Sequence, residues 1–202
     1  MARKVFYSFH YKRDVQRAAQ IRNSHSIADE DEYGVIDGVD WEKIEQGGKE
    51  AVKKWINEQL RYTSVTAVLI GAETAERDWV DYEIRRSWER GNALVGVRIH
   101  NVKNLDGKTD VPGPNPFDNI YFVDDTPLSS ICKTYDWVAN DGISNLGKWV
   151  EEAFQERESY TGEKNLRNSD NNVDSSINRS PTGSLSQTRP AIIQNPPKPW
   201  VQ

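Results

Sequence analysis

Hydrophobic and polar positions follow two alternating patterns over the first 160 residues of the chain. Short apolar runs that are typical of strands occur at residues 4–9, 33–36, 63–71 and 94–99. Elsewhere apolar side chains recur every three or four positions, which predicts helices over residues 11–23, 49–60, 79–90 and 143–157. Strands that alternate with helices in this way indicate an α/β domain built on a doubly wound parallel sheet.

The run at residues 63–71 is the most informative of these patterns. Its apolar positions do not alternate strictly, as expected for a parallel strand that is covered on both faces. The run ends at Gly71, and Trp79, Tyr82 and Glu83 follow on the next predicted helix. Because ligands bind beyond the carboxyl ends of strands in open α/β sheets, we expect a pocket at this rim.

A long segment at residues 101–134 precedes the last predicted helix. It contains Pro112, Pro114 and Pro116, and proline fixes backbone torsions, so its GPNPFD motif is suited to holding one shape. Segments of this length are often functional lids, but a surface excursion is equally consistent with the pattern. Trp137, just beyond the segment, is predicted to be a core residue.

The composition changes near Tyr160, which predicts a domain at residues 1–160 and a tail at residues 161–202. The tail is rich in Asn, Ser, Thr, Gln and Pro, and Trp200 is its only aromatic residue. Such a segment buries too little apolar area to offset the entropy lost on ordering, so we predict that it is disordered. Its end, PAIIQNPPKPW, is interpreted as a solvated terminus, with an extended docking peptide as the alternative.

Composition excludes several function classes. The net charge of −5 and the absence of a basic stripe argue against a nucleic-acid binder. The single cysteine, Cys132, excludes an intrachain disulfide and a thiol-rich metal site, which fits a reducing compartment. The first apolar run is too short for a signal peptide or a membrane-spanning helix. We therefore expect a soluble, cytoplasmic protein that has neither nucleic acid nor membrane as a partner.

Common catalytic and cofactor-binding motifs do not occur. No GxGxxG or GxxxxGK[ST] phosphate loop follows a predicted strand, and HExxH and GxSxG are both missing. The three histidines, His10, His25 and His100, are not at metal-ligand spacing. No metal cofactor is expected.

Several motifs occur in a fixed order along the chain: KVFYSFHYKRD, the pair Arg22-Asn23, VIDG followed by DWE, SVTAVLIG, WVDYEIRRSWERGN, GPNPFD and YDWVANDG. Together, over about residues 3–155, they resemble the TIR-like proteins of bacterial Thoeris antiphage systems. The resemblance implies a flavodoxin-like TIR fold with strand order 2-1-3-4-5. It also implies an enzyme that cleaves NAD to nicotinamide and a signalling ADP-ribose derivative, usually a cyclic isomer.

The resemblance further implies the partners of the protein. The messenger would activate a separate effector protein that depletes NAD, and a phage-derived component would act as the trigger. NAD is then a substrate, so no resident cofactor is expected. The identity of the ADP-ribose product and self-association are left open.

Glu83 matches the catalytic glutamate of the TIR family, on the helix after the third predicted strand. Breaking the bond between nicotinamide and ribose builds positive charge on the sugar, which a nearby carboxylate stabilises. The alternative for Glu83 is a solvated helix position, the usual one for glutamate. Trp79, one turn earlier on the same side, either stacks on a base or nicotinamide ring or belongs to the core.

Further candidate residues follow the first predicted strand. An aromatic edge and a hydroxyl there are suited to the nicotinamide ribose, although Phe6 fits a core position equally well. His10 and Tyr11 are candidates for contact with phosphate or a second substrate. The predicted substrate-binding residues are Phe6, Ser8, Phe9, His10, Arg22, Asn23, Asp37, Trp41, Trp79 and Tyr82.

Some of these residues also have a structural interpretation. Asp37 and Trp41 fall in the place of the loop that shapes TIR pockets, but Asp-Gly is also a turn signal. Arg22 and Asn23 either bind the pyrophosphate through charge-assisted hydrogen bonds or cap the first helix.

Two other functions are consistent with the same fold. A non-catalytic interaction module predicts that Glu83 points to solvent or into a salt bridge. A nucleoside deoxyribosyltransferase-like enzyme also uses a carboxylate at a sugar centre, but the ordered motifs favour the Thoeris type. The NAD-cleaving enzyme requires Glu83 to face a pocket that it shares with Phe6, Ser8 and Asp37.

Overall fold

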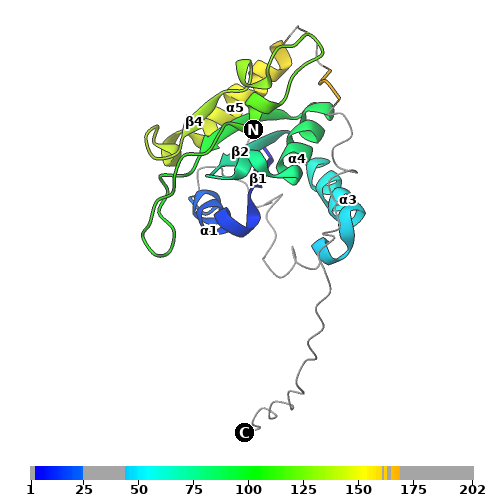
Figure 1. The fold of residues 1–202 in the computed structure, drawn as a ribbon. Helices are drawn as coiled ribbons and strands as arrows, with labels where there is room; N and C mark the ends of the chain where they lie inside the picture. The colour runs from blue at the N-terminus through cyan, green and yellow to red at the C-terminus, as the bar shows by residue number, and fades with distance from the viewer. Residues whose placement is uncertain (1–2, 25–43, 161, 163–164, 169–202) are drawn as a thin grey trace, which may run out of the picture. The chain divides into compact units, whose positions relative to one another are not determined.

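The computed structural model describes residues 3–24, 44–160, 162 and 165–168, and the fold is given for these ranges (Figure 1). They contain one sheet of four parallel strands in the order β1-β2-β3-β4. The strands are β1 Val5–Phe9, β2 Val65–Ile70, β3 Ala93–Arg98 and β4 Thr134–Asp136. The prediction of a parallel α/β sheet is confirmed. The predicted strand at residues 33–36 lies outside the described residues.

The register brings the carboxyl ends of the first three strands to one edge of the sheet. Val5 pairs with Val65, which in turn pairs with Ala93. At the other end of the strands, Phe9 pairs with Leu69. Side chains that follow these strands therefore meet above one edge, as the rim hypothesis requires.

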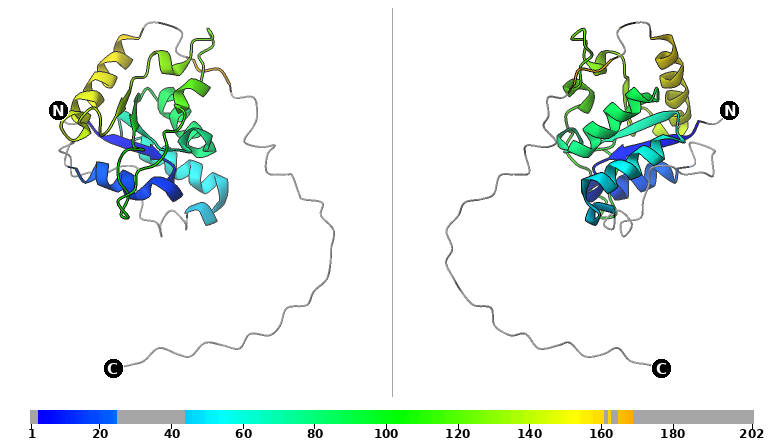
Figure 2. Two further views of the ribbon diagram at one scale, coloured as in Figure 1. Left: turned by 60° about the vertical axis from the view of Figure 1, so that its left-hand side comes forward. Right: turned by 90° about the vertical axis from the view of Figure 1, so that its right-hand side faces the viewer.

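Helices cover both faces of the sheet, as the views in Figures 1 and 2 show. Helices α1 Tyr11–Arg22 and α5 Gly142–Ser159 pack against one face. Helices α3 Gly48–Leu60 and α4 Asp78–Glu89 pack against the other. All four agree with the predicted helices to within two residues at each end.

The strand β2 is the centre of the core. All six of its residues are buried, because α1 and α5 cover one side, and α4 and the ring of Phe117 cover the other. This confirms that the non-alternating apolar run is a strand covered on both faces. Trp137 is buried in the cluster that contains α5, so its prediction as a core residue is also confirmed.

Neither interpretation of the long segment describes all of it. Its middle carries two short 3₁₀ helices, Pro116–Asn119 and Leu128–Ser130, and buries Phe117 beside the sheet. Its first part is a surface excursion along α1, where Gln20 donates to the carbonyl of Lys103. No residue of the segment lines the pocket described below, so within the described ranges it is not a lid.

Packing continues a short way beyond Tyr160. The backbone N–H of Val123 donates to the carbonyl of Asn165, and Leu166 forms a β-bridge with Phe122. The division between residues 160 and 161 stays a prediction, and residues 169–202 lie outside the described ranges. Among the helices that are described, none is long and apolar enough to cross a membrane.

Candidate active site

Glu83 and Ser8 meet beneath the rim of the sheet. Ser8 is on β1 and faces α4, and its hydroxyl donates to Oε2 of Glu83 over 2.5 Å. Glu83 is only 6% exposed, which excludes the solvated position that was the alternative. Burial raises the pKa of Glu83 to about 8, while the hydrogen bond from Ser8 acts in the opposite direction. The carboxyl group is therefore largely protonated at neutral pH.

Local sequence explains why α4 presents Glu83 at this place. Asp78 and Asp81 lie in the first turn, where negative charge stabilises a helix, and Asp81 pairs with Arg85 one turn later at 2.8 Å. Gly91, with a φ of 88°, follows the end of the helix in the left-handed conformation that favours glycine.

Two further hydroxyls fix α4 to the sheet. The hydroxyl of Ser87 donates to the carbonyl of Glu83 over 2.6 Å, and it lies 2.7 Å from the hydroxyl of Thr66 on β2. All three residues are buried. The backbone of Glu83 is thus tied to β2 while its side chain is tied to β1.

A pocket of about 180 Å³ opens beside Glu83. It is formed by the end of β1, the start of α1, the region around α3 and the first turns of α4. Aromatic rings make up much of its wall, and basic groups lie among them. The described lining residues are Tyr7, Phe9, His10, Tyr11, Lys12, Glu45, Trp55, Arg77, Trp79, Val80 and Glu83.

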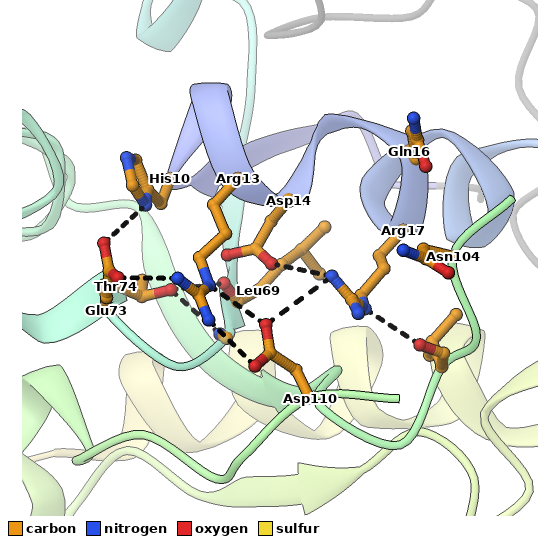
Figure 3. Close-up of polar contacts among 12 residues, drawn as sticks. His10, Arg13, Asp14, Gln16, Arg17, Leu69, Glu73, Thr74, Asn104 and Asp110 are labelled. Carbon is orange, nitrogen blue, oxygen red and sulfur yellow. Dashed lines mark hydrogen bonds and ion pairs between the residues drawn. The ribbon is translucent and has the colours of Figure 1, made fainter. Parts of the chain in front are cut away.

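Glu73 connects the basic groups of the pocket, as Figure 3 shows in part. Its carboxylate accepts from Arg77 over 2.8 Å and lies 3.7 Å from Nδ1 of His10. Burial lowers the pKa of His10, and the nearby Arg77 lowers it further. His10 is therefore mostly neutral at pH 7, and Arg77 and Lys12 are the cations among the described lining residues.

A chain of ion pairs continues from Glu73 away from the pocket (Figure 3). Arg13 donates to Glu73 over 2.6 Å and forms two hydrogen bonds with Asp110, of 3.0 and 2.9 Å. Arg17 lies 3.8 Å from Asp110 and 3.5 Å from Asp14. Asp14 is fully buried, and desolvation raises its pKa to about 6. The chain links the pocket wall to the surface loop that carries Asp110.

Several predicted substrate-binding residues lie in the pocket wall and others lie behind it. Phe9, His10 and Trp79 line the pocket. Phe6 instead belongs to the core, with its ring 6.3 Å from that of Trp55. Tyr82 packs behind Trp79, and its hydroxyl accepts a hydrogen bond from Asn57.

The structure does not bring Arg22 and Asn23 to this pocket. The helix α1 starts beside the pocket at Tyr11 and runs away from it, so Arg22 lies about 15 Å along the helix from Lys12, the last described lining residue on α1. Asn23 is the C-cap residue of α1, where its backbone N–H donates to Ala19. The capping interpretation therefore describes Asn23. Asp37 and Trp41 lie outside the described residues.

Sequence reasoning missed several residues of the site. Arg77, Lys12, Glu45 and Trp55 come from four separate places along the chain. Lys12 follows the end of β1 and Arg77 is the N-cap residue of α4, so their positions at strand and helix ends were a usable signal. No group of three or more potential ligands for a metal ion is present among the described residues.

Comparison with known proteins shows which family the sequence resembles. Residues 6–104 match the family described as Thoeris protein ThsB, TIR-like domain. A protein of Bacillus cereus (strain MSX-D12), named "Putative cyclic ADP-D-ribose synthase ThsB1", is 33% identical over 191 residues. That alignment covers 74% of this chain and 100% of the relative. Every described lining residue of the pocket falls within the range that matches the family.

Proposed function

The chain belongs to the Thoeris ThsB family of TIR-like proteins, and from this premise we propose that it is an enzyme that cleaves NAD. The products are nicotinamide and an ADP-ribose-type signal. Glu83 is the catalytic carboxylate. The observation that carries the proposal is a buried glutamate, held by a hydroxyl and open to a pocket with aromatic walls.

The chemistry uses the charge of the substrate. The nicotinamide ring of NAD is a cation, and it leaves as a neutral molecule when the bond to ribose breaks. Positive charge then develops on the sugar, and an ionised Glu83 stabilises it most strongly because the site is desolvated. A bound pyridinium cation also favours ionisation of Glu83, so the substrate itself promotes the active form of the carboxyl group.

The pocket wall supplies binding groups for two parts of NAD, the nicotinamide ring and the diphosphate. The rings of Phe9, Trp55 and Trp79 are suited to stacking against the nicotinamide. Arg77 and Lys12 provide positive charge for the diphosphate. No resident cofactor is part of the proposal, since NAD is consumed as the substrate.

The same observations argue against a non-catalytic interaction module. That reading predicts Glu83 in solvent or in a salt bridge. Glu83 is 6% exposed, and the one hydrogen bond that its carboxyl group receives from a described side chain comes from the neutral hydroxyl of Ser8. A buried carboxyl with a raised pKa beside a pocket is typical of an active site. A deoxyribosyltransferase-like reaction has no observation here that favours it over NAD cleavage.

The proposal also includes the signalling product and the effector protein that it activates. The name of the Bacillus cereus relative refers to synthesis of cyclic ADP-D-ribose, and a cyclic isomer of this kind is proposed as the product here. Cyclisation requires a nucleophile of the substrate itself, either a ring nitrogen of its adenine or a ribose hydroxyl, to attack the ribose carbon that nicotinamide leaves, in place of water. The messenger activates a separate effector protein, and a phage-derived component is the proposed trigger.

Mass spectrometry tests the proposal directly. Purified protein, and lysate from phage-infected cells that express it, are incubated with NAD, beside Glu83→Gln. Glu89→Gln is the matched control, because Glu89 lies on the same helix but is exposed and paired with Arg86. The wild type and Glu89→Gln are expected to release nicotinamide and an ADP-ribose product, and Glu83→Gln to release neither. Equal product from Glu83→Gln excludes it as the catalyst, and no product under any trigger favours the interaction module.

A further inference from the structure

The hydroxyl of Ser8 is committed to the carboxylate of Glu83. Ser8 is 1% exposed, and the donor and acceptor are 2.5 Å apart. Glu83 lines the pocket, whereas Ser8 is not among the described lining residues. Ser8 therefore lies behind the carboxylate that lines the pocket, whereas the sequence had suggested that its hydroxyl contacts the ribose directly.

No described cation neutralises Glu83. The titratable groups that share its pocket come from β1, α1, the residues before α3 and the start of α4. These groups are Tyr7, His10, Tyr11, Lys12, Glu45 and Arg77. In the part of the chain that the structure describes, none of them forms a hydrogen bond or an ion pair with the carboxyl group of Glu83. Ser8 is thus the one described side chain that stabilises charge on the carboxylate.

We propose, resting on NAD cleavage as the function, that Ser8 is a positioning residue for the reaction. Its hydroxyl holds Oε2 of Glu83, so that Oε1 is left to face the ribose of a cationic pyridinium nucleotide. The hydrogen bond also favours the ionised carboxylate, because a donor stabilises the negative form more than the neutral one. The proposal gives Ser8 a role in rate and pH dependence rather than in substrate affinity.

The first experiment measures kcat and KM for NAD from about pH 6 to about pH 10. Ser8→Ala is expected to lower kcat/KM about tenfold at neutral pH, mainly through kcat, and to move the pH midpoint upward. The loss shrinks as the pH rises, since the carboxyl group then ionises without help. Ser8→Thr, which keeps a hydroxyl, is expected to restore the wild-type midpoint.

Thr66→Val is the matched control. Thr66 lies on the neighbouring strand, is fully buried, and directs its hydroxyl to Ser87 on the same helix. The substitution removes a buried hydroxyl of similar environment without touching the carboxylate. Its pH midpoint is expected to equal that of the wild type, whatever its effect on stability.

The second experiment needs no activity. Carboxyl carbon NMR follows the ionisation of Glu83 in the folded protein, with Glu83→Gln to assign the signal. Ser8→Ala raises the midpoint of this titration if the inference is correct. Should Ser8→Ala fail to fold, Ser8→Cys replaces it, and the weaker thiol donor gives a smaller shift in the same direction.

The outcomes separate this inference from the proposed function. Turnover of NAD by the wild type with an unchanged midpoint for Ser8→Ala, by rate and by NMR, overturns the role of Ser8 and leaves NAD cleavage intact. A raised KM with unchanged kcat also overturns it, because that result places Ser8 in binding. An upward shift by NMR in a protein that consumes no NAD under any trigger overturns the proposed function, and the role of Ser8 in positioning Glu83 for that reaction falls with it.

Discussion

The carboxylate of Asp14 lies directly against the α-carbon of Gly71, at the point where β2 ends. A Cβ added to Gly71 would be 2.2 Å from Oδ2 of Asp14 and 2.7 Å from Oδ1. Asp14 is fully buried, and its carboxylate lies 3.5 Å from the guanidinium of Arg17. Glycine is therefore required here because the Asp14 carboxylate approaches the backbone too closely for a Cβ. The apolar run of β2 ends at the point where this residue of α1 packs against it.

Gly71→Ala is expected to destabilise the fold by roughly 1–3 kcal/mol, the usual cost of overpacking a tight site. Urea unfolding measured by circular dichroism gives the change. Gly147→Ala is the control, since Gly147 is exposed within α5 and alanine there is expected to stabilise the helix by about 0.5–1 kcal/mol. Equal stability of Gly71→Ala and the wild type contradicts the close packing of Asp14 on this glycine.

Glu83→Gln is expected to be more stable than the wild type at pH 8, although it is inactive. The pKa of Glu83 is about 8 in the folded protein and near 4.5 in the unfolded chain. The folded state therefore favours the protonated form, so this contribution is complete below pH 4.5 and is lost as the pH rises to 8. Glutamine remains neutral, and its advantage at pH 8 is on the order of a few kcal/mol. Thermal unfolding at pH 4.5 and pH 8 checks this. A difference that is equal at both values contradicts the raised pKa.

The raised pKa of Glu83 also predicts the pH dependence of the wild-type enzyme. Catalysis needs the ionised carboxylate, and kcat/KM reports the free enzyme, so its rise is expected to have a midpoint near pH 8. Burial lowers the pKa of His10, so its titration moves away from that of Glu83. Initial rates at low NAD concentration across the pH range give the profile. Between pH 6 and pH 9 the ionised fraction of Glu83 is expected to increase roughly a hundredfold. A flat profile over this range would therefore exclude Glu83 as the ionised catalytic carboxylate.

Most of the fold was predictable because apolar patterns survive in the strands and helices of its core. The run that forms β2 has no exposed face, so every position in it is buried and informative. β4 was missed because Thr134–Asp136 is short and half-buried, and its place in the sheet depends on pairing with Gly96–Arg98 far along the chain. Asp14 and Arg17 were not predicted to lie on the buried face of α1, because charged residues in a sequence are normally interpreted as exposed.

The site was predictable only in its centre. Glu83 and Trp79 lie on one helix directly after a clear strand, so a local pattern placed them at the rim. Lys12 and Arg77 each lie at the end of a strand or helix, but only the tertiary fold brings the two to the same pocket. Arg22 lies away from this pocket because a helix that starts at the rim carries its last residues to the opposite end.

Arg77 and Arg22 give a direct test of this difference. Arg77→Ala is expected to raise KM for NAD about tenfold, through loss of a charged hydrogen bond to the diphosphate, with a smaller effect on kcat. Arg22→Ala is expected to leave both constants unchanged, since Arg22 is at the far end of α1. Steady-state kinetics at one pH is sufficient. A raised KM for Arg22→Ala would return the pyrophosphate contact to that residue.

The paired hydrogen bonds between Arg13 and Asp110 are expected to stabilise the surface loop modestly. The hydrogen bonds from Arg13 lower the pKa of Asp110, so the contribution is present above the pKa of the unfolded chain and is lost as the pH falls through the lower folded value. Asp110→Asn is expected to cost about 1 kcal/mol at neutral pH, because the pair is partly exposed. Asp106→Asn, an exposed change in the same loop, is expected to cost nothing measurable. Urea unfolding at neutral pH and in mild acid separates the two variants. A cost for Asp110→Asn that does not decrease in acid would assign its effect to packing instead of charge.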